Sequence, residues 1–160
     1  MRTYQGPALR LATIICGDPT EAYDIVQEAF VNAHRALSTI RADESLRPWL
    51  MRIVANQAKN SRRSRWRRDA RAANQARLRV DDAVGADTAA LDAVAAETLL
   101  RAVEQLPLND RSVIACRFFA GMSEAETAVA LGIANGTVKS RTARALTRLR
   151  TSIVREEMVI

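Results

Sequence analysis

The stretch from Gly121 to Arg150 constrains this chain most, because it has the pattern of two short helices around a glycine turn. Ser123 followed three residues later by Glu126 has the form of a capping box, so a helix is expected to start at Ser123. Gly132 can end that helix in the left-handed conformation that other residues adopt only with strain. The apolar positions at helical spacing before the turn are Ala125, Ala128, Val129 and Leu131.

A second helix is expected to open near Asn135 to Thr137 and to carry cations on its exposed face. In a helix-turn-helix the second helix enters the major groove of DNA. A solvated basic face is the alternative, but no acid occurs from Gly132 to Arg155. The predicted core face holds Val138, Thr142, Ala145, Leu146 and Leu149, and the predicted DNA-facing residues are Lys139, Ser140, Ala143, Arg144 and Thr147.

The composition is that of a soluble protein of 160 residues, with 48% hydrophobic and 26% charged residues. Neither a membrane-spanning run nor a signal-peptide pattern occurs, so no membrane insertion and a cytoplasmic location are expected. Cys16, Cys116 and the lone His34 are too few and too far apart for a zinc site, so no metal is expected. We expect both cysteines to be buried structural thiols, with redox sensing as the less favoured alternative, and His34 to lie on a helix surface.

Charge alternates along the chain: the net charge is +8 over residues 1–79, −6 over 80–110 and +4 over 111–160. Two basic modules joined by an acidic connector are therefore predicted, and a basic module most often binds nucleic acid. Residues 73–96 are rich in Ala and Asp and are predicted to be a flexible linker. The prediction is an all-α fold with two small helical domains, at 1–72 and 97–160.

The first module is predicted to present an acidic face on its second helix. Ala8 to Ile15 is helix-compatible, and after the break at Gly17 either Asp18 or Thr20 can cap the next helix, whose apolar periodicity runs from Thr20 to Ser38. This face is either merely solvated or meets a protein, since DNA would repel it. Its residues are Glu21, Asp24, Gln27, Glu28 and Asn32.

A third helix is predicted from Leu46, with Pro48 near its first turn, and it continues into a run of cations. Only Asp69 opposes these cations within the run, so phosphate contact is the favoured role and a solvated basic surface the alternative. Trp66 within the run could stack on an unpaired base. The cations are Lys59, Arg62, Arg63, Arg65, Arg67, Arg68 and Arg71.

The second domain is expected to start near Ala96, with a helix interrupted at Pro107 and Asn109 or Asp110 capping the next one. No glycine-rich phosphate loop and no pairing of a nucleophile with a base occurs in the sequence, so no catalytic site and no cofactor are predicted. The apolar stripe before Pro107 consists of Leu99, Leu100, Val103 and Leu106.

Four segments in order resemble the signatures of bacterial extracytoplasmic-function sigma factors of the sigma-70 family. They are residues 17–30, residues 49–56, Leu106-Pro107 with Arg111, and residues 136–141. The resemblance implies a promoter-recognition subunit that binds core RNA polymerase and directs promoter melting and transcription initiation. It also implies an anti-sigma factor as a further partner.

The resemblance also implies roles for particular residues. Asp24, Gln27 and Glu28 would bind the polymerase β′ clamp helices, and the second domain would meet the β flap. Arg141 and Arg148 would touch phosphates. The −10 set is Trp49, Arg52, Asn56, Lys59, Arg62, Arg63, Arg65 and Trp66, and the −35 set is Thr137, Lys139, Ser140, Arg141, Ala143, Arg144 and Arg148.

Several positions depart from the family pattern. The chain begins later than is usual, so the first helix is expected to be short or absent. Ala55 and Asn60 stand where an arginine and an aspartate are common, and Asn135 is expected to cap the recognition helix because Ala134 cannot. A stand-alone helix-turn-helix repressor or activator is the alternative function, but it would leave the first module unexplained. An RNA-binding or nucleic-acid-modifying protein would leave the recognition helix unexplained.

Overall fold

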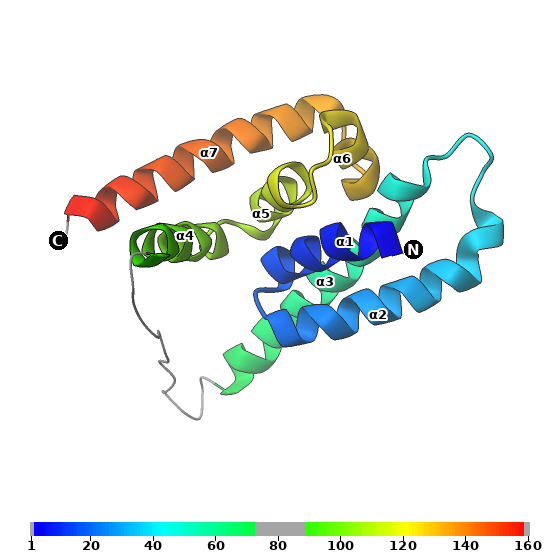
Figure 1. Cartoon of the computed structure of the whole chain (residues 1–160), viewed down its shortest axis with the longest axis horizontal. Helices are drawn as coiled ribbons and strands as arrows, with labels where there is room; N and C mark the ends of the chain where they lie inside the picture. Colours follow the sequence, from blue (N-terminus) through cyan, green and yellow to red (C-terminus); the bar gives the residue numbers. More distant parts are fainter. Residues whose placement is uncertain (1, 73–88, 159–160) are drawn as a thin grey trace.

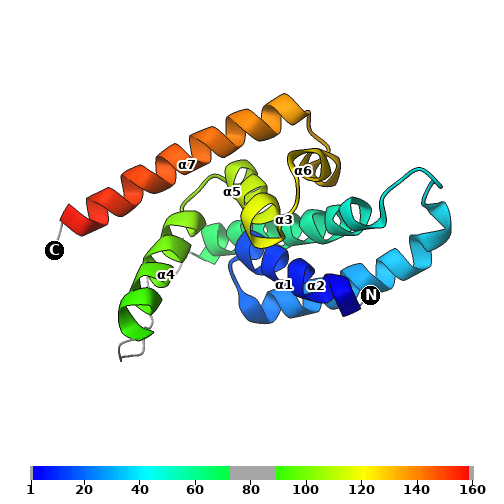
Figure 2. The ribbon, with the colours of Figure 1, turned by 45° about the horizontal axis from the view of Figure 1, so that its top comes forward.

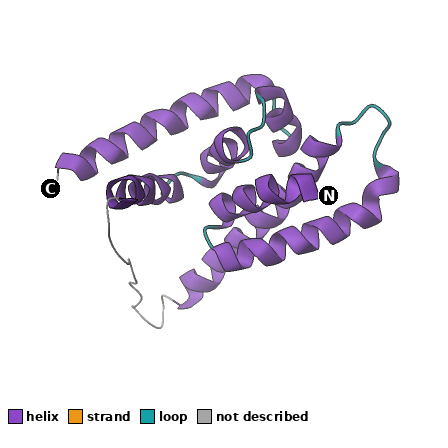
Figure 3. Ribbon diagram, in the orientation of Figure 1, coloured by secondary structure: helices purple, strands orange, loops and turns teal. Residues whose placement is uncertain are grey.

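The computed structural model describes residues 2–72 and 89–158, and every regular element in these ranges is helical (Figures 1 and 3). This confirms the all-α prediction. The sequence interpreted as the start of the linker, residues 73–88, lies outside the described residues. The elements are α1 (Arg2–Cys16), α2 (Pro19–Ala36), η1 (Leu37–Thr39), α3 (Leu46–Ala72), α4 (Ala89–Glu104), α5 (Leu108–Ile114), η2 (Ala115–Phe119), α6 (Glu124–Leu131) and α7 (Asn135–Met158).

The N-terminal unit is formed by α1, α2 and α3. Helix α1 spans 15 residues, so the expectation of a short or absent first helix is wrong. Gly17 ends it with a φ of 79°, and the Asp18 carboxylate then accepts hydrogen bonds from the backbone N–H groups of Thr20 and Glu21. Helix α3 continues through the basic run as predicted. The aliphatic residues Leu50, Met51 and Val54 on its N-terminal half are buried.

The C-terminal unit begins with α4, which starts earlier than the predicted Ala96. Pro107 occupies the N-cap position of α5 and no side chain caps this helix, so the expectation that Asn109 or Asp110 caps it is wrong. Asp110 is instead buried and paired with arginines of α7. Packing of α7 against α5 brings two arginines to this carboxylate. Asp110 therefore forms ion pairs with them and does not cap its own helix.

The helix-turn-helix consists of α6 and α7, and its predicted turn chemistry is confirmed. The Ser123 hydroxyl accepts from the Glu126 N–H, the Glu126 carboxylate accepts from the Ser123 N–H, and Gly132 has a φ of 64°. The Ala134 carbonyl accepts the first α7 hydrogen bonds, so Asn135 is the first helical residue and not the cap.

The core face of the helix-turn-helix differs in part from the prediction. In α6 the buried residues are Thr127 and Ala130, while Val129 is 52% exposed. In α7, Val138, Ala145 and Leu149 are buried as predicted, but Leu146 is 43% exposed. Helix α6 has only eight residues and packs against both α3 and α7. The spacing of its apolar residues alone therefore does not determine which of its faces is buried.

The two units share one hydrophobic core. Leu11 and Met51 of the N-terminal unit belong to the same buried cluster as Ile114, Met122 and Ala130 of the C-terminal unit. Helix α6 packs on α3, and α5 packs on α1 (Figure 2). The described structure is therefore a closed arrangement in which the units cover part of one another.

Arg47, in the first turn of α3, ties the two units together through polar contacts. Its Nη2 donates to the carbonyl oxygens of Ala120 at 2.6 Å and Gly121 at 3.1 Å. Its Nη1 lies 3.4 Å from Glu126 Oε1. A second tie comes from α1, where Arg10 Nε donates to the Phe119 carbonyl at 2.8 Å.

Candidate nucleic-acid and polymerase interfaces

Helix α7 lies at the edge of the molecule, on the far side of α5 and α6 from α2 (Figure 1). It packs against α4, α5 and α6, which cover the side that holds Val138 and Leu149. Of the residues predicted to contact the −35 element, Thr137 and Arg141 are half-buried, and Lys139, Ser140, Ala143, Arg144 and Arg148 are exposed. This surface is open to a ligand in the closed arrangement.

Arg144 is held by a buried carboxylate that the sequence prediction missed. Its Nη2 and Nε donate to the two Asp110 oxygens at 2.6 and 3.1 Å, and Arg148 Nη1 lies 3.3 Å from Asp110 Oδ2. These hydrogen bonds from Arg144 are the main reason that the pKa of Asp110 is lowered, and the same pair raises the pKa of Arg144. Two features of the sequence could have indicated this pairing. Asp110 is an acid in the first turn of α5, and Arg144 and Arg148 are four residues apart on α7.

Lys139 has a weaker partner. Its Nζ lies 3.8 Å from Glu124 Oε2, and both side chains are largely exposed. An exposed pair at this distance contributes little, about 0–1 kcal/mol. Lys139 is therefore accessible to a phosphate or a base.

The basic half of α3 has partners on other helices. Arg65 lies 2.8 Å from Glu21 and 3.9 Å from Asp18, and Arg62 donates to the Cys16 carbonyl at 3.2 Å. These cations neutralise the carboxylates at the start of α2 and the carbonyl end of α1. The sequence prediction counted acids only within the basic run and missed this pairing, because the fold brings Glu21 of α2 to Arg65.

The other members of the predicted −10 set differ in exposure. Trp49 and Lys59 are half-buried, whereas Arg52, Asn56 and Arg63 are exposed. Burial lowers the pKa of Lys59. Helix α6 lies over the N-terminal half of this helix, and the Arg52 guanidinium reaches the vicinity of Gly132.

Two positions where the sequence departs from the family pattern lie in different surroundings. Ala55, where an arginine is common in the family, is fully buried in the shared core. The surrounding residues pack directly against its methyl group. Asn60 is exposed and lines the groove between α2 and α3. The core thus explains the first departure but not the second.

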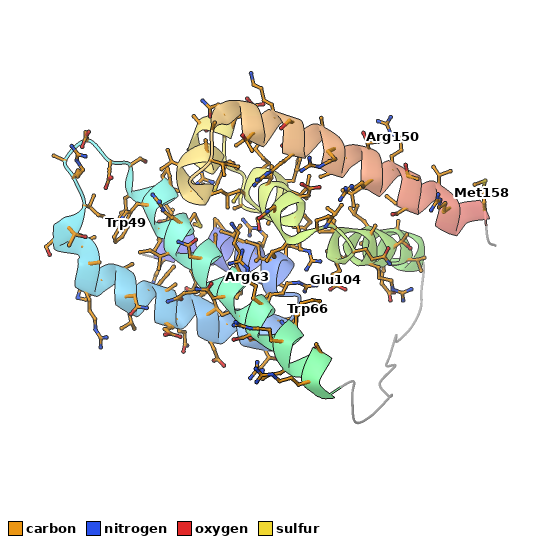
Figure 4. The ribbon with its side chains drawn as sticks, turned by 180° about the vertical axis from the view of Figure 1, so that it is seen from behind. Trp49, Arg63, Trp66, Glu104, Arg150 and Met158 are labelled. Atoms are coloured by element: carbon orange, nitrogen blue, oxygen red, sulfur yellow. The ribbon has the colours of Figure 1, made fainter. Side chains whose placement is uncertain are left out.

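Trp66 marks an open groove between the units. It is 73% exposed and lies with Arg63 opposite Glu104 of α4 (Figure 4). The groove has a volume of about 510 Å³, similar to the groove of about 470 Å³ between α2 and α3. Its lining combines an aromatic face with cations: Arg62, Arg63, Trp66, Glu104, Gln105, Leu106, Pro107, Leu108 and Arg111.

The predicted polymerase-binding residues share one face of α2. Asp24, Gln27 and Glu28 are all exposed, on the side of α2 that faces solvent. Asp24 and Glu28 also line the groove of about 470 Å³ against α3, with Glu21 hydrogen-bonded to Ser61 at its end. The remaining lining residues are Ile25, Gln57, Asn60 and Ser64.

Cys16 and Cys116 are free and buried, as predicted, and His34 is exposed. Burial raises the pKa of both thiols, that of Cys116 to about 12. Among the described residues, no group of three or more His, Cys, Asp or Glu side chains could hold a metal ion. In the same described part of the chain, no helix is both long enough and apolar enough to cross a membrane.

The fold and the exposed α7 define a helix-turn-helix protein of two helical units. Residues 1–68 match the family model for sigma-70 region 2, and residues 96–149 match the model for sigma-70, region 4. The chain is 35% identical over 150 residues to the RNA polymerase sigma-H factor of Pseudomonas aeruginosa, covering 89% of this chain and 78% of that protein. It is 38% identical over 140 residues to the ECF RNA polymerase sigma factor SigM of Mycobacterium tuberculosis, covering 88% and 68%.

Solved structures agree with the family models. The fold is similar to that of the sigma factor RpoE in complex with the anti-sigma factor NepR from Bartonella quintana, with a TM-score of 0.72 and 26% identity over 93% of this chain and 91% of that one. CnrH in complex with the cytosolic domain of CnrY gives a TM-score of 0.64 and 29% identity over 93% and 82%. This chain belongs to the sigma-70 family of RNA polymerase sigma factors, in its extracytoplasmic-function group. It is thus a sigma factor that serves promoter recognition, and members of this family are in general DNA-recognition subunits and not enzymes.

Proposed function

We propose that α7 contacts the −35 element through its exposed face, with Arg144 on a base edge and Lys139 and Arg148 on or near phosphates. The observation that carries this proposal is the cation-bearing face of α7, which the C-terminal unit leaves open. Arginine is the side chain that most often contacts guanine in the major groove, through two parallel hydrogen bonds. Ser140 and Ala143 complete the surface between these cations.

The N-terminal unit would hold the melted −10 element, and the C-terminal unit, which begins with α4, would hold the −35 element. Two elements about 25 base pairs apart are roughly 85 Å apart along B-DNA. A compact chain of 160 residues has a radius of gyration of about 15 Å. The closed arrangement is therefore too small to engage both elements at once, and the units must separate on the polymerase.

Single-stranded promoter DNA would bind along α3. Arg63 and the exposed Trp66 offer a cation beside an aromatic face, which suits a phosphate and a stacked base. Arg52 and Asn56 lie near the helix-turn-helix in the closed arrangement, so separation of the units would increase their access to DNA. Arg62 and Arg65 would act indirectly, by fixing the corner between α1 and α2.

Core polymerase would bind the acidic face of α2. Asp24, Gln27 and Glu28 are exposed on one side of this helix, and carboxylates there would be repelled by DNA. The β′ clamp helices are the proposed partner, and the C-terminal unit would meet the β flap. The protein would act in the cytoplasm, where polymerase and chromosome are, and would have no catalytic activity of its own.

An anti-sigma factor is the proposed inhibitory partner. One structure with the same fold is a complex with the anti-sigma factor NepR, and another is a complex with the cytosolic domain of CnrY. A partner that binds across both units would hold them closed, which would prevent simultaneous contact with the two promoter elements. Isolation of the protein from its host, without inducing stress, is expected to recover this partner; repeated recovery of polymerase subunits alone would contradict it.

Reconstitution tests the proposed function. Core RNA polymerase with this protein is expected to initiate at promoters that neither component uses alone. A stand-alone repressor or activator would instead bind duplex DNA tightly without polymerase. Failure to bind core polymerase, together with tight binding of duplex DNA by the chain alone, would favour that second function.

A further inference from the structure

Asp110 is a buried carboxylate placed directly beside the recognition helix. Its side chain is 2% exposed, although it lies 34 residues before Arg144 in the chain. A buried carboxylate is tolerated only where charges or hydrogen bonds satisfy it. Arg144 and Arg148 provide two partners, and the N-terminal turn of α5 adds a favourable dipole.

The pairing uses one edge of the Arg144 guanidinium and leaves the other edge available. Nε and Nη2 each donate to one Asp110 oxygen. A guanidinium has five N–H donors in a planar fork, so both Nη1 hydrogens and the second Nη2 hydrogen remain. Guanine O6 and N7 accept two parallel hydrogen bonds, which this outer edge can supply. The Arg144 side chain is 52% exposed, so a large part of it is accessible to a ligand.

Fixing the guanidinium in advance favours selective contact. A free arginine loses much rotamer freedom when it docks, and a mobile one can move from a base to a nearby phosphate. Asp110 holds the fork in one plane and thereby restricts which base edge it can meet. Arg148, one turn further along α7, is held by the same carboxylate on the same side of the helix.

We propose that Asp110 is a positioning residue for promoter specificity: it orients Arg144 toward a guanine of the −35 element and anchors Arg148 beside it. This inference rests on the proposed contact between α7 and the −35 element. Asp110 itself touches no DNA, because it is buried beneath the two arginines. Its charge is compensated by them, so it contributes to discrimination between bases and not to overall attraction.

The test uses holoenzyme, formed from core polymerase and the full chain, on a promoter library with a randomised −35 element. Transcript counts give the preference at each position. Arg144→Ala is expected to reduce the guanine preference at one position by about 5- to 150-fold. Asp110→Asn is expected to reduce it at that same position by about 3- to 10-fold, and the double variant should match Arg144→Ala alone.

Two further variants keep the result interpretable. Glu124→Gln changes the charge by the same amount as Asp110→Asn, next to α7, but at an exposed pair, so the base preference should stay as in the wild type. Arg144→Lys retains a cation near Asp110 and lies on the surface, so it does not depend on Asp110→Asn folding. Lysine lacks the fork, and the guanine preference is expected to fall as in Arg144→Ala.

The outcomes separate the two levels of the proposal. If the wild-type holoenzyme shows no −35 preference, or Arg144→Ala leaves that preference intact, the contact proposed for α7 is refuted. If Arg144→Ala removes the preference but a folded Asp110→Asn variant keeps it, or loses activity equally at all sequences, only the role of Asp110 is overturned. An unchanged preference with Arg144→Lys would also overturn it, since a point charge would then suffice.

Discussion

Arg47 is predicted to hold the closed arrangement, and Arg47→Ala should open it. The side chain spans the two units, donating to the Ala120 and Gly121 carbonyls and pairing with Glu126. Hydrogen bonds from a charged group contribute about 1.5–3 kcal/mol each when buried, and exposed ion pairs about 0–1 kcal/mol. Ala120 is buried, whereas Gly121 is exposed and can bond to water once Arg47 is gone.

The expected loss is therefore about 2–3 kcal/mol, dominated by the contact with Ala120. At 1.4 kcal/mol per tenfold change, this lowers the ratio of closed to open molecules by about 30- to 140-fold. The shared apolar core remains, so the variant should still fold. Its units should separate more often.

Fluorescence energy transfer between α2 and α7 of the free chain measures this change. Dyes at Val31→Cys and Arg150→Cys use exposed positions, while the two native cysteines are buried. Arg41→Ala is the matched control, because Arg41 pairs only loosely with Asp43, at 3.8 Å and on the surface. If Arg47→Ala and Arg41→Ala give the same transfer efficiency as the wild type at every denaturant concentration, the polar tie does not stabilise the closed arrangement.

Three further predictions address docking, burial and the turn. The charge reversals Asp24→Lys and Glu28→Lys should each weaken binding to core polymerase by about tenfold or more, measured by pull-down titration. The thermal unfolding of the free chain should not change, because both side chains are exposed. Binding equal to that of the wild type would exclude this face as the polymerase contact. Burial raises the pKa of Cys116 to about 12, against about 8.5 in the unfolded chain. Its contribution to stability is thus complete below pH 8.5 and declines as pH rises from there toward 12, because the unfolded chain releases its proton first. Alkylation by iodoacetamide at pH 8.5 should be slow in the native protein and fast in denaturant, and rapid native labelling would show that the thiol is accessible. Gly132→Ala should lower the free energy of unfolding by about 1 kcal/mol through backbone strain at a φ of 64°, with no clash, since the nearest atom to an added Cβ is a flexible Arg52 nitrogen 3.5 Å away. A chemical denaturation curve that matches the wild type would contradict this estimate.

Patterns within a few residues could be predicted from the sequence. The capping box of Ser123 and Glu126, the left-handed Gly132 and the Asp18 cap are local, since their hydrogen bonds join residues two to four apart. The uninterrupted α3 was predicted on the same basis. The family was also recognisable, because its signatures are short segments in a fixed order.

Pairings between distant helices were decided by the tertiary structure. Arg65 finds Glu21, Arg144 finds Asp110 and Arg47 finds Ala120 across 34 to 73 residues of chain. Sequence spacing gives each helix its faces but not the neighbour that each face meets. Which charged side chains pair over such distances depends on how the helices pack. The sequence therefore determined the helices and the glycine turn. Only the packing decided which cations are paired within the protein and which remain accessible to DNA.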